Sequence, residues 1–341
     1  FHAAGLKIFG PDARAAQLEG SKDYALNFMN NYGVPTAKHA SYRDQTAILE
    51  HVDQFGYPVV IKENGLAGGK GVVIAQDHDA AVQTIKEMFA SGQARIVLEE
   101  CLNGPEYSMF VVISNGHYRI LPMAQDHKRA YDGDKGPNTG GMGSYSPNPQ
   151  LSATDRQRMI DEVVKPTVDG LVKGEYHYHG VLYIGLMLTT DGPKVIEYNV
   201  RLGDPETQVV LPRLDTDLYQ LVDAAINDQP LPAISETAEA SFGVVLAYKG
   251  YPQKPIHGQE LGSFPEGSEV EIDYANVTGT LSHLQGAGGR LLMVLAQAGT
   301  LQEAHDRVYT YLEKLDQPEC FYRHDTVSYT HLRAHETRRH L

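Results

Sequence analysis

The chain contains no tryptophan and only two cysteines, Cys101 and Cys320, among its 341 residues. Two cysteines cannot form a disulfide framework in a chain of this length, and such sparse use is typical of a reducing compartment. No run of 18 apolar residues occurs, so the sequence contains no candidate transmembrane helix. The first residues also lack the pattern of a secretory signal. We therefore expect a cytoplasmic protein without a membrane partner.

Basic residues are scarce as well. The 29 Lys and Arg residues face 43 Asp and Glu residues, which gives a net charge of −14. This balance argues against a protein that coats DNA or RNA, because such binding needs cations to neutralise phosphates. It leaves room for a local basic pocket that binds a phosphorylated small molecule. Hydrophobic residues make up 42% of the chain, enough for a sizeable core, and the length predicts two or three domains.

Both ends of the chain differ from the body. Residues 6–9 are expected to form a short strand and Gly10-Pro11 a turn, the pattern that closes an α/β unit. Residues 328–341 hold three Arg and three His residues without an apolar period. This segment resembles translated vector sequence, and we expect it to be non-native. The alternative is a basic, solvated tail.

Hydrophobic periodicity and turn residues predict a mixed α/β fold. Ser21 is the expected N-cap of a helix over 21–31, which Gly33 and Pro35 end. The other predicted helices cover residues 44–55, 78–91, 153–173, 215–228 and 300–315. The predicted strands cover residues 58–62, 72–75, 95–99, 106–113, 117–124, 181–189 and 194–200. The segment 125–149 is predicted to be a long loop, and loops of that length are usually functional.

A glycine-rich segment, residues 65–71, lies between two predicted strands. Its spacing fits neither the Walker A motif nor the dinucleotide-binding fingerprint. Glycines at such a place free backbone N–H groups to meet phosphate oxygens, and Lys62 and Lys70 add positive charge. The alternative is a flexible hairpin tip without a ligand.

A second group of polar residues lies on and after the predicted strand 194–200. Alternation places Glu197 and Asn199 on one face of this strand, where their oxygens suit Mg²⁺. Arg201 follows at once and can bind a phosphoryl group in transfer. Asp204 and Glu206 lie in the next turn. The alternatives are a half-exposed edge strand and an acidic surface turn.

Two further segments carry chemistry. In the loop 125–149, Lys128 and Arg129 offer cations, and Asn138 and Thr139 offer side-chain donors and acceptors. Backbone N–H groups are expected to be exposed at Gly140, Gly141 and Gly143, and the whole set suits a polar or anionic substrate. The strand end at 97–102 can hold a purine, and a nearby carboxylate can hold ribose hydroxyls. The alternatives are a surface loop and a plain crossover between strands.

In this order, the segments resemble the glycinamide ribonucleotide synthetase (phosphoribosylamine–glycine ligase) family of the ATP-grasp superfamily. The resemblance spans residues 1 to about 327 and rests on Gly10-Pro11, residues 15–22, VIK (60–62), LAGGKG (66–71), EECL with GxExS (99–108), QDHKR (125–129), GPNTGGMG (136–143) and VIEYNVRLGDPETQ (195–208). GPNTGGMG and RLGDPE are specific to this family. The resemblance implies an ATP-dependent ligase of purine biosynthesis. It would join glycine to 5-phosphoribosylamine through glycyl phosphate, giving glycinamide ribonucleotide, ADP and phosphate.

The resemblance also implies roles for individual residues. Lys62 and Arg201 are the implied catalytic residues, and Glu197 and Asn199 are the implied ligands of Mg²⁺ or Mn²⁺. The implied ATP-binding residues are Lys22, Lys62, Gly68, Gly69, Lys70, Gly71, Glu99, Glu100, Leu102 and Glu106. The implied substrate-binding residues are Asp126, Lys128, Arg129, Asn138, Thr139, Gly140, Gly141, Asp204 and Glu206.

The implied architecture is an α/β ATP-grasp core in a monomer. Its expected parts are a remnant of an N-terminal dinucleotide-fold-like domain (1–20), a central domain (21–39 and 95–234), a lid (40–94) and a β-rich C-terminal domain (235–327). Two alternatives stay open. A different ATP-grasp carboxylate–amine ligase or purine-pathway carboxylase would use bicarbonate or formate in place of glycine. Because most of the family's first domain is missing from this sequence, a non-catalytic fragment would bind ATP without turnover.

Overall fold

The computed structural model describes residues 1–326 except 2–3, 67–70, 255–256, 265–268 and 281. The chain divides into two compact units. The first unit comprises residues 1–123, 149–203 and 214–235. The second unit comprises residues 124–148, 204–213 and the chain from 236 onward. None of the helices within the described residues is long and apolar enough to cross a membrane.

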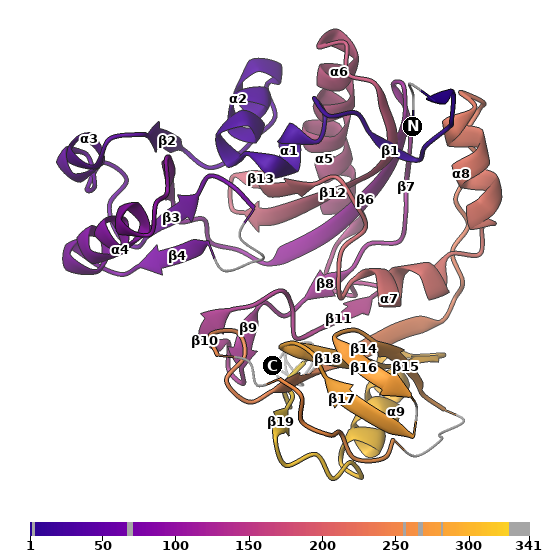
Figure 1. Cartoon of the computed structure of the whole chain (residues 1–341). Coiled ribbons are helices and arrows are strands. Elements are labelled where there is room, and N and C mark those ends of the chain that lie inside the picture. The colour runs from indigo at the N-terminus through magenta and orange to yellow at the C-terminus, as the bar shows by residue number, and fades with distance from the viewer. Residues whose placement is uncertain (2–3, 67–70, 255–256, 265–268, 281, 327–341) are drawn as a thin grey trace, which may run out of the picture. The chain divides into compact units, whose positions relative to one another are not determined.

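The larger sheet of the first unit has five strands in the order β1-β12-β6-β7, with β13 also paired to β12. Its strands are β1 (Gly10–Pro11), β6 (Glu106–Ser114), β7 (His117–Ile120), β12 (Tyr178–Thr189) and β13 (Gly192–Asn199). The helices of this part are α1 (Gln17–Gly20), α2 (Lys22–Tyr32), α5 (Ala153–Met159), α6 (Lys165–Lys173) and α8 (Leu218–Ile226). Figure 1 shows α2, α5 and α6 on the same side of this sheet. Phe28, Val164 and Tyr198 belong to the apolar core between them.

The predicted ends of α2 are confirmed. The Ser21 side chain accepts a hydrogen bond from the backbone N–H of Tyr24, and Gly33 closes the helix in the left-handed conformation with φ 70°. The predicted helix 153–173 is also present, but a π-helical turn at Ile160–Val164 separates α5 from α6.

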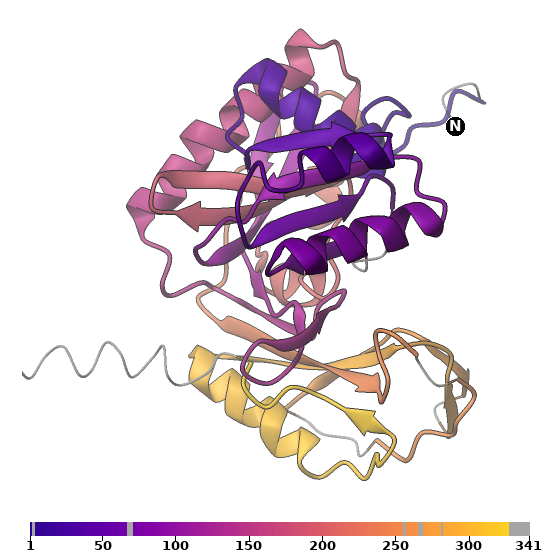
Figure 2. The ribbon, with the colours of Figure 1, turned by 90° about the vertical axis from the view of Figure 1, so that its left-hand side faces the viewer.

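The smaller sheet of the first unit has four antiparallel strands in the order β2-β5-β3-β4. They are β2 (His39–Tyr42), β3 (Val59–Glu63), β4 (Val72–Ala75) and β5 (Ile96–Glu100), and the helices α3 (Gln45–Glu50) and α4 (His78–Ala90) cover one face of the sheet (Figure 2). The β3–β4 pair confirms the predicted strands around the glycine-rich segment. The sheet also includes β5, whereas the domain bounds predicted from the sequence assign these residues to the central domain and not to the lid.

The second unit is built on a six-stranded sheet in the order β15-β18-β14-β11-β8, with β19 paired to β14. Its strands are β8 (Gln125–Asp126), β11 (Gly143–Ser146), β14 (Ala240–Tyr248), β15 (Glu271–Tyr274), β18 (Arg290–Ala298) and β19 (Cys320–Phe321). Two further strand pairs are β9 (Arg129–Tyr131) with β10 (Lys135–Asn138), and β16 (Val277–Thr280) with β17 (His283–Gly286). Helix α9 (Leu301–Leu312) packs on β14 and β18, and α7 (Thr207–Val210) is a single turn.

Two expectations about local structure are wrong. The segment 125–149 is not one long loop, because it contains β8, β9, β10 and β11. Its strands are short, and β11 pairs with β14 almost a hundred residues later in the sequence. The segment therefore lacks the local alternation of apolar and polar residues by which strands are predicted. Residues 6–9 form no strand, whereas Gly10-Pro11 forms β1 at the edge of the larger sheet. An edge strand tolerates proline because the missing N–H faces no partner strand.

Candidate active site

The predicted site residues fall into two groups, one in each unit. The first group is centred on Lys62 of β3, whose ammonium lies 2.7 Å from Oε2 of Glu99 on β5. Lys62 also donates a hydrogen bond to the carbonyl of Ile196 on β13 at 3.1 Å. Both charged side chains are almost fully buried, with Lys62 5% exposed and Glu99 4% exposed. The pair therefore places an oriented cation beside the strand that carries Glu197.

Lys22 supplies a second cation to this group. It is the first residue of α2, and its ammonium donates to the carbonyl of Gly65, 2.9 Å away, at the start of the glycine-rich segment. Burial and the neighbouring positive charge of Lys62 lower the pKa of Lys22, whereas the carboxylates of Glu197, Glu63 and Glu99 oppose that shift. Because each of these two charges disfavours the other, the pair favours binding of an anion, which would stabilise both.

The remaining predicted ATP-binding residues lie around this group or outside the described residues. Glu100, at the end of β5, is bonded to the ammonium of Lys194 at 3.0 Å and to the backbone N–H of Lys38 at 2.9 Å. These bonds hold the pKa of Glu100 below its usual value although burial opposes the shift. Leu102 follows β5, and Glu106 begins β6. Gly71 precedes β4 and is buried, whereas Gly68, Gly69 and Lys70 lie outside the described residues.

The predicted metal pair lies at the end of β13. Glu197 and Asn199 alternate with the buried Tyr198, so their side chains share the face opposite the core. Arg201 points back at this pair: its Nη2 lies 3.4 Å from Oδ1 of Asn199, and its Nε lies 3.1 Å from Oε1 of Glu19. The described residues contain no group of three His, Cys, Asp or Glu side chains arranged for a metal ion. The candidate pair is thus one carboxylate and one amide oxygen.

The second group lies in the second unit and is centred on Asp126 of β8. Its carboxylate oxygens are buried and accept no hydrogen bond from the described residues, although the Lys128 ammonium lies 2.8 Å from Oδ2. The same ammonium is 3.9 Å from Oε1 of Glu206, whose side chain is also buried. One cation therefore lies between two buried carboxylates. The contact with Lys128 is a close ion pair without the alignment of a hydrogen bond.

The predicted substrate loop packs against this group. Thr139 donates through both its backbone N–H and its hydroxyl to the carbonyl of Lys128, at 2.8 and 2.9 Å. Arg129 Nη1 donates to the carbonyl of Gly136 at 2.8 Å, and Asn138 is opposite Arg129 in the β9–β10 pair. These bonds give residues 136–141 a defined conformation.

The expectation that Gly140 and Gly141 expose their N–H groups is wrong. The Gly140 N–H donates to the Tyr251 hydroxyl at 3.0 Å, and the Gly141 N–H donates to the Thr139 hydroxyl at 3.0 Å. Their carbonyls accept from Arg290 instead, at 3.0 and 3.3 Å. The glycines therefore serve the internal geometry of the loop, with both N–H groups already bonded.

Sequence reasoning missed four residues that orient predicted ones: Glu19, Lys194, Tyr251 and Arg290. Glu19 lies within a family motif, but nothing local shows that its carboxylate accepts from both Arg201 and the backbone of Val200. Arg290 pairs with Asp204 at 2.7 Å across 86 residues of sequence. Only the fold brings such residues together.

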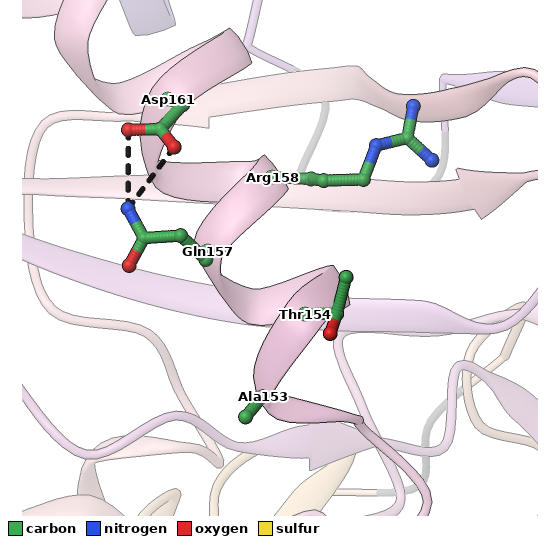
Figure 3. Close-up of a pocket in the computed structure, with 5 residues that line it drawn as sticks. All are labelled: Ala153, Thr154, Gln157, Arg158 and Asp161. Atoms are coloured by element: carbon green, nitrogen blue, oxygen red, sulfur yellow. Dashed lines mark hydrogen bonds between the residues drawn. The ribbon is translucent and has the colours of Figure 1, made fainter.

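The structure also has a surface hollow on helix α5. Figure 3 shows its lining side chains, which all come from this helix or the π-helical turn after it: Ala153, Thr154, Gln157, Arg158 and Asp161. Gln157 donates to both carboxylate oxygens of Asp161 at 3.1 Å. No residue with a predicted role lines this hollow, so it is separate from the candidate site.

Sequence comparisons give consistent matches for both units. Residues 20–207 match the family described as phosphoribosylglycinamide synthetase, ATP-grasp (A) domain, and residues 241–327 match the corresponding C domain. A phosphoribosylamine–glycine ligase of Lactococcus lactis is 45% identical over 330 residues, which cover 96% of this chain and 79% of that protein. A ligase of the same name from Streptococcus pneumoniae is 45% identical over 340 residues, with 96% and 80% covered.

Solved structures give the same result. The crystal structure of a phosphoribosylamine–glycine ligase from Thermotoga maritima superposes with a TM-score of 0.84 at 36% identity, covering 93% of this chain and 81% of that one. A biotin carboxylase domain from Hydrogenobacter thermophilus, solved with MgADP, ADP and bicarbonate, has a TM-score of 0.72 at 17% identity, covering 94% of this chain and 71% of that one. The second likeness is one of fold alone.

Proposed function

Because the chain belongs to the phosphoribosylglycinamide synthetase family, the ATP-dependent phosphoribosylamine–glycine ligases of purine biosynthesis, we propose that it joins its substrates through glycyl phosphate. The chain uses ATP to join glycine to phosphoribosylamine. The observation that carries the proposed mechanism is the convergence of Lys22 and Lys62 beside Glu197 in the first unit.

The chemistry requires activation of a poor acyl donor. A glycine carboxylate oxygen attacks the γ-phosphorus of ATP, the bond between that phosphorus and the ADP oxygen breaks, and ADP leaves. The amine nitrogen of phosphoribosylamine then attacks the glycyl carbon, the carbon–oxygen bond to phosphate breaks, and a proton is lost from nitrogen. The first step brings an anion to a polyanion, and one like-charge pair at 4 Å costs about 4 kcal/mol at an effective dielectric of 20.

Residues of the first unit can offset this repulsion. We propose that Lys22 and Lys62 bind the ATP phosphates, and that Arg201, oriented by Glu19, stabilises the phosphoryl group in transfer. Further proposed contacts to ATP come from Glu99, Glu100 and Leu102 around adenine, Glu106 at ribose and residues 68–71 at the phosphates. Residues 40–94 would act as a lid that keeps water from the acyl phosphate.

The donor set at the end of β13 fits a divalent cation. Mg²⁺ takes hard oxygen ligands and shares them with substrate phosphates, and Glu197 and Asn199 offer a carboxylate and an amide oxygen on one strand face. These two residues would hold Mg²⁺ or Mn²⁺. When bound, the cation would supply positive charge to the phosphates. The chain's own residues would fix its place, with Arg201 hydrogen-bonded to Asn199 beside it.

The second unit supplies the proposed contacts to glycine and phosphoribosylamine. Asp126 is a buried carboxylate that pairs with the Lys128 ammonium but accepts no aligned hydrogen bond from the described residues, which leaves acceptor capacity for an ammonium or amine group. Lys128 and Arg129 carry cations that suit a phosphate. The other proposed substrate residues are Asn138, Thr139, Gly140, Gly141, Asp204 and Glu206. We also propose that the enzyme is a cytoplasmic monomer, which sedimentation at the mass of one chain would support.

The test of the intermediate is an isotope transfer. The chain is supplied with Mg-ATP, freshly generated phosphoribosylamine and glycine labelled with ¹⁸O in its carboxylate. Glycyl phosphate predicts that one ¹⁸O atom per turnover appears in inorganic phosphate. Product formed without label in phosphate would contradict it. ATP binding without glycine-dependent ADP release would favour the fragment that binds but does not turn over.

The test of the first group is Glu197→Gln. We expect turnover to fall by about 100-fold or more, and the Mg²⁺ concentration for half-maximal rate to rise, because a charged ligand is lost. The matched control is Glu162→Gln, which removes a half-exposed carboxylate, paired with Arg158, on the π-helical turn. Wild-type turnover with an unchanged Mg²⁺ requirement in Glu197→Gln would remove the metal assignment.

A further inference from the structure

We propose that Arg290 is a positioning residue for glycine and phosphoribosylamine. It would act by holding the glycine-rich loop 136–143 against Asp204. This inference rests on the proposed assignment of that loop and of Asp204 to substrate binding. Arg290 begins β18, in the β-rich part of the second unit. Its side chain is 17% exposed, so it is largely enclosed by the groups that it bonds.

The guanidinium joins two segments that are far apart in sequence. Its Nη1 donates to the carbonyls of Gly140 and Asp204, each at 3.0 Å, and its Nη2 lies 2.7 Å from Oδ2 of Asp204. Nη1 also lies 3.3 Å from the carbonyl of Gly141. One side chain thus fixes the backbone of the loop, the backbone of the next substrate segment and a carboxylate.

Asp204 is fixed at both of its oxygens. While Oδ2 accepts from Arg290, Oδ1 accepts from the side-chain amide of Gln208 at 3.0 Å. The Asp204 side chain nevertheless stays 52% exposed. It is therefore a carboxylate with a set direction that solvent can still reach, which is what a contact to a substrate needs.

The loop glycines leave the space that this arrangement requires. A Cβ on Gly140 would lie 3.1 Å from Cζ of Arg290, and a Cβ on Gly141 would lie 2.4 Å from Cδ of Pro205. Gly141 also has a φ of +113°, which side chains rarely adopt. The Tyr251 hydroxyl accepts from the Gly140 N–H on the other side. The backbone of the loop can therefore contact the Arg290 guanidinium directly, with no side chain between them.

Only arginine can make this set of bonds. Its planar fork presents donors in two fixed directions, whereas a lysine ammonium is a point charge on a flexible stem. Lysine at this position could pair with Asp204 or with a loop carbonyl, but it would not hold both in one geometry. The conservative variant Arg290→Lys therefore keeps the charge and removes the positioning.

The experiment measures the kinetics of Arg290→Lys in the full chain. We expect the KM for glycine or for phosphoribosylamine to rise by about 10-fold or more, while the KM for ATP changes by less than about 2-fold. Calorimetry should show weaker binding of glycinamide ribonucleotide at an unchanged stoichiometry. If the role of Arg290 is purely structural, the variant should contain less folded protein, so kcat and the binding stoichiometry should fall while the KM values stay unchanged. That result would overturn the proposal.

The matched control is Arg307→Lys. Arg307 lies on α9 in the same unit, and its Nη1 donates to the carbonyl of Gln297 at 2.8 Å. Its replacement should leave all three KM values within about 2-fold of wild type. A general effect of losing any buried arginine bond in this unit would change both variants alike.

Asp204→Asn separates this inference from the assignment on which it rests. If Asp204→Asn weakens substrate binding and Arg290→Lys does not, the assignment stands and the role of Arg290 is wrong. If neither variant changes the binding of glycine, phosphoribosylamine or product, the assignment of this segment has failed and the inference fails with it.

Discussion

At the scale of single residues, the most consequential feature is the buried ion pair between Lys62 and Glu99. Both side chains are buried, and burial of a charged group costs free energy. The attraction between Nζ of Lys62 and Oε2 of Glu99, 2.7 Å apart, offsets part of this cost. Removal of one partner leaves the other as an uncompensated charge in a medium of low dielectric. Stability of the smaller sheet therefore depends on Lys62, the same side chain that we propose binds the ATP phosphates.

We therefore expect Glu99→Leu to lower the free energy of unfolding by about 3 kcal/mol. The double variant Lys62→Met/Glu99→Leu should recover most of this loss, because an apolar pair of similar volume leaves no buried charge. Urea denaturation of the three proteins measures both effects. The control is Glu162→Leu, which breaks an ion pair with Arg158 that is 39% exposed on each side and should cost about 0.5 kcal/mol. A double variant less stable than Glu99→Leu would contradict this account.

At the scale of elements, the start of α2 links a helix cap to the site. The Ser21 hydroxyl caps the helix and lies 3.1 Å from Oδ1 of Asn64, and the Lys22 N–H donates to the Asn64 carbonyl at 2.9 Å. The first turn of α2 is thereby tied to the residue that follows β3. Lys22 projects from this turn, so its position depends on the cap.

Ser21→Ala should lower the free energy of unfolding by about 1 kcal/mol through loss of the N-cap. It should also raise the KM for ATP by about 3- to 10-fold, since Lys22 would no longer be held in place. Ser152→Ala is the matched control, because Ser152 caps α5 in the same way with a 3.0 Å bond from the Asp155 N–H. We expect Ser152→Ala to cost similar stability at an unchanged KM for ATP. Equal KM values in the two variants would contradict the link.

The elements that the sequence predicted are those with local signals. Ser21 and Gly33 mark the ends of α2 within a few residues, and short runs of consecutive apolar residues mark β3 and β4 on either side of the glycines. The strands β8–β11 lacked such a signal, because each has only two to four residues, and because β11, on which β8 pairs, is itself paired with β14 far along the chain. A search for periodicity therefore treats them as loop.

The same distinction separates the predicted from the missed site residues. Lys62, Glu197 and Arg201 lie in motifs that a reader of the sequence can recognise. Arg290 acts on Gly140 across 150 residues, and Glu19 acts on Arg201 across 182 residues. Residues that orient others through the fold have no spacing to detect, although a structure identifies them at once from their hydrogen bonds.

At the scale of the whole molecule, the response to acid should include a contribution from one histidine of the second unit whose pKa is lowered, His127. His127 follows β8, and burial together with the positive charge of Arg323 lowers its pKa to about 4. Arg323 is itself only 1% exposed and pairs with Asp134 and Asp325 at 2.8 Å. Asp126, Asp134 and Asp325 also face His127 but do not reverse the shift.

The sign of the effect follows from where the proton binds. Above a pH of about 6.5, His127 is neutral in both the folded and the unfolded chain and contributes nothing. Between about pH 6.5 and 4, the unfolded chain takes up a proton at this residue and the folded chain does not. The free energy of unfolding should therefore fall by up to about 1.4 kcal/mol per pH unit, and by about 3 kcal/mol in total.

Urea denaturation of the wild type and of His127→Gln between pH 7 and 4 isolates this contribution. The many carboxylates of this acidic chain affect both proteins alike, so they cancel in the difference between the two curves. Over this range, we expect the free energy of unfolding of the wild type to fall by about 3 kcal/mol more than that of the variant. This expectation does not depend on the difference in stability between the two proteins at pH 7. Parallel curves would show that His127 takes up its proton equally in both states. Acid would then destabilise the chain only through its other titratable groups, and Arg323 would not disfavour a second cation beside it.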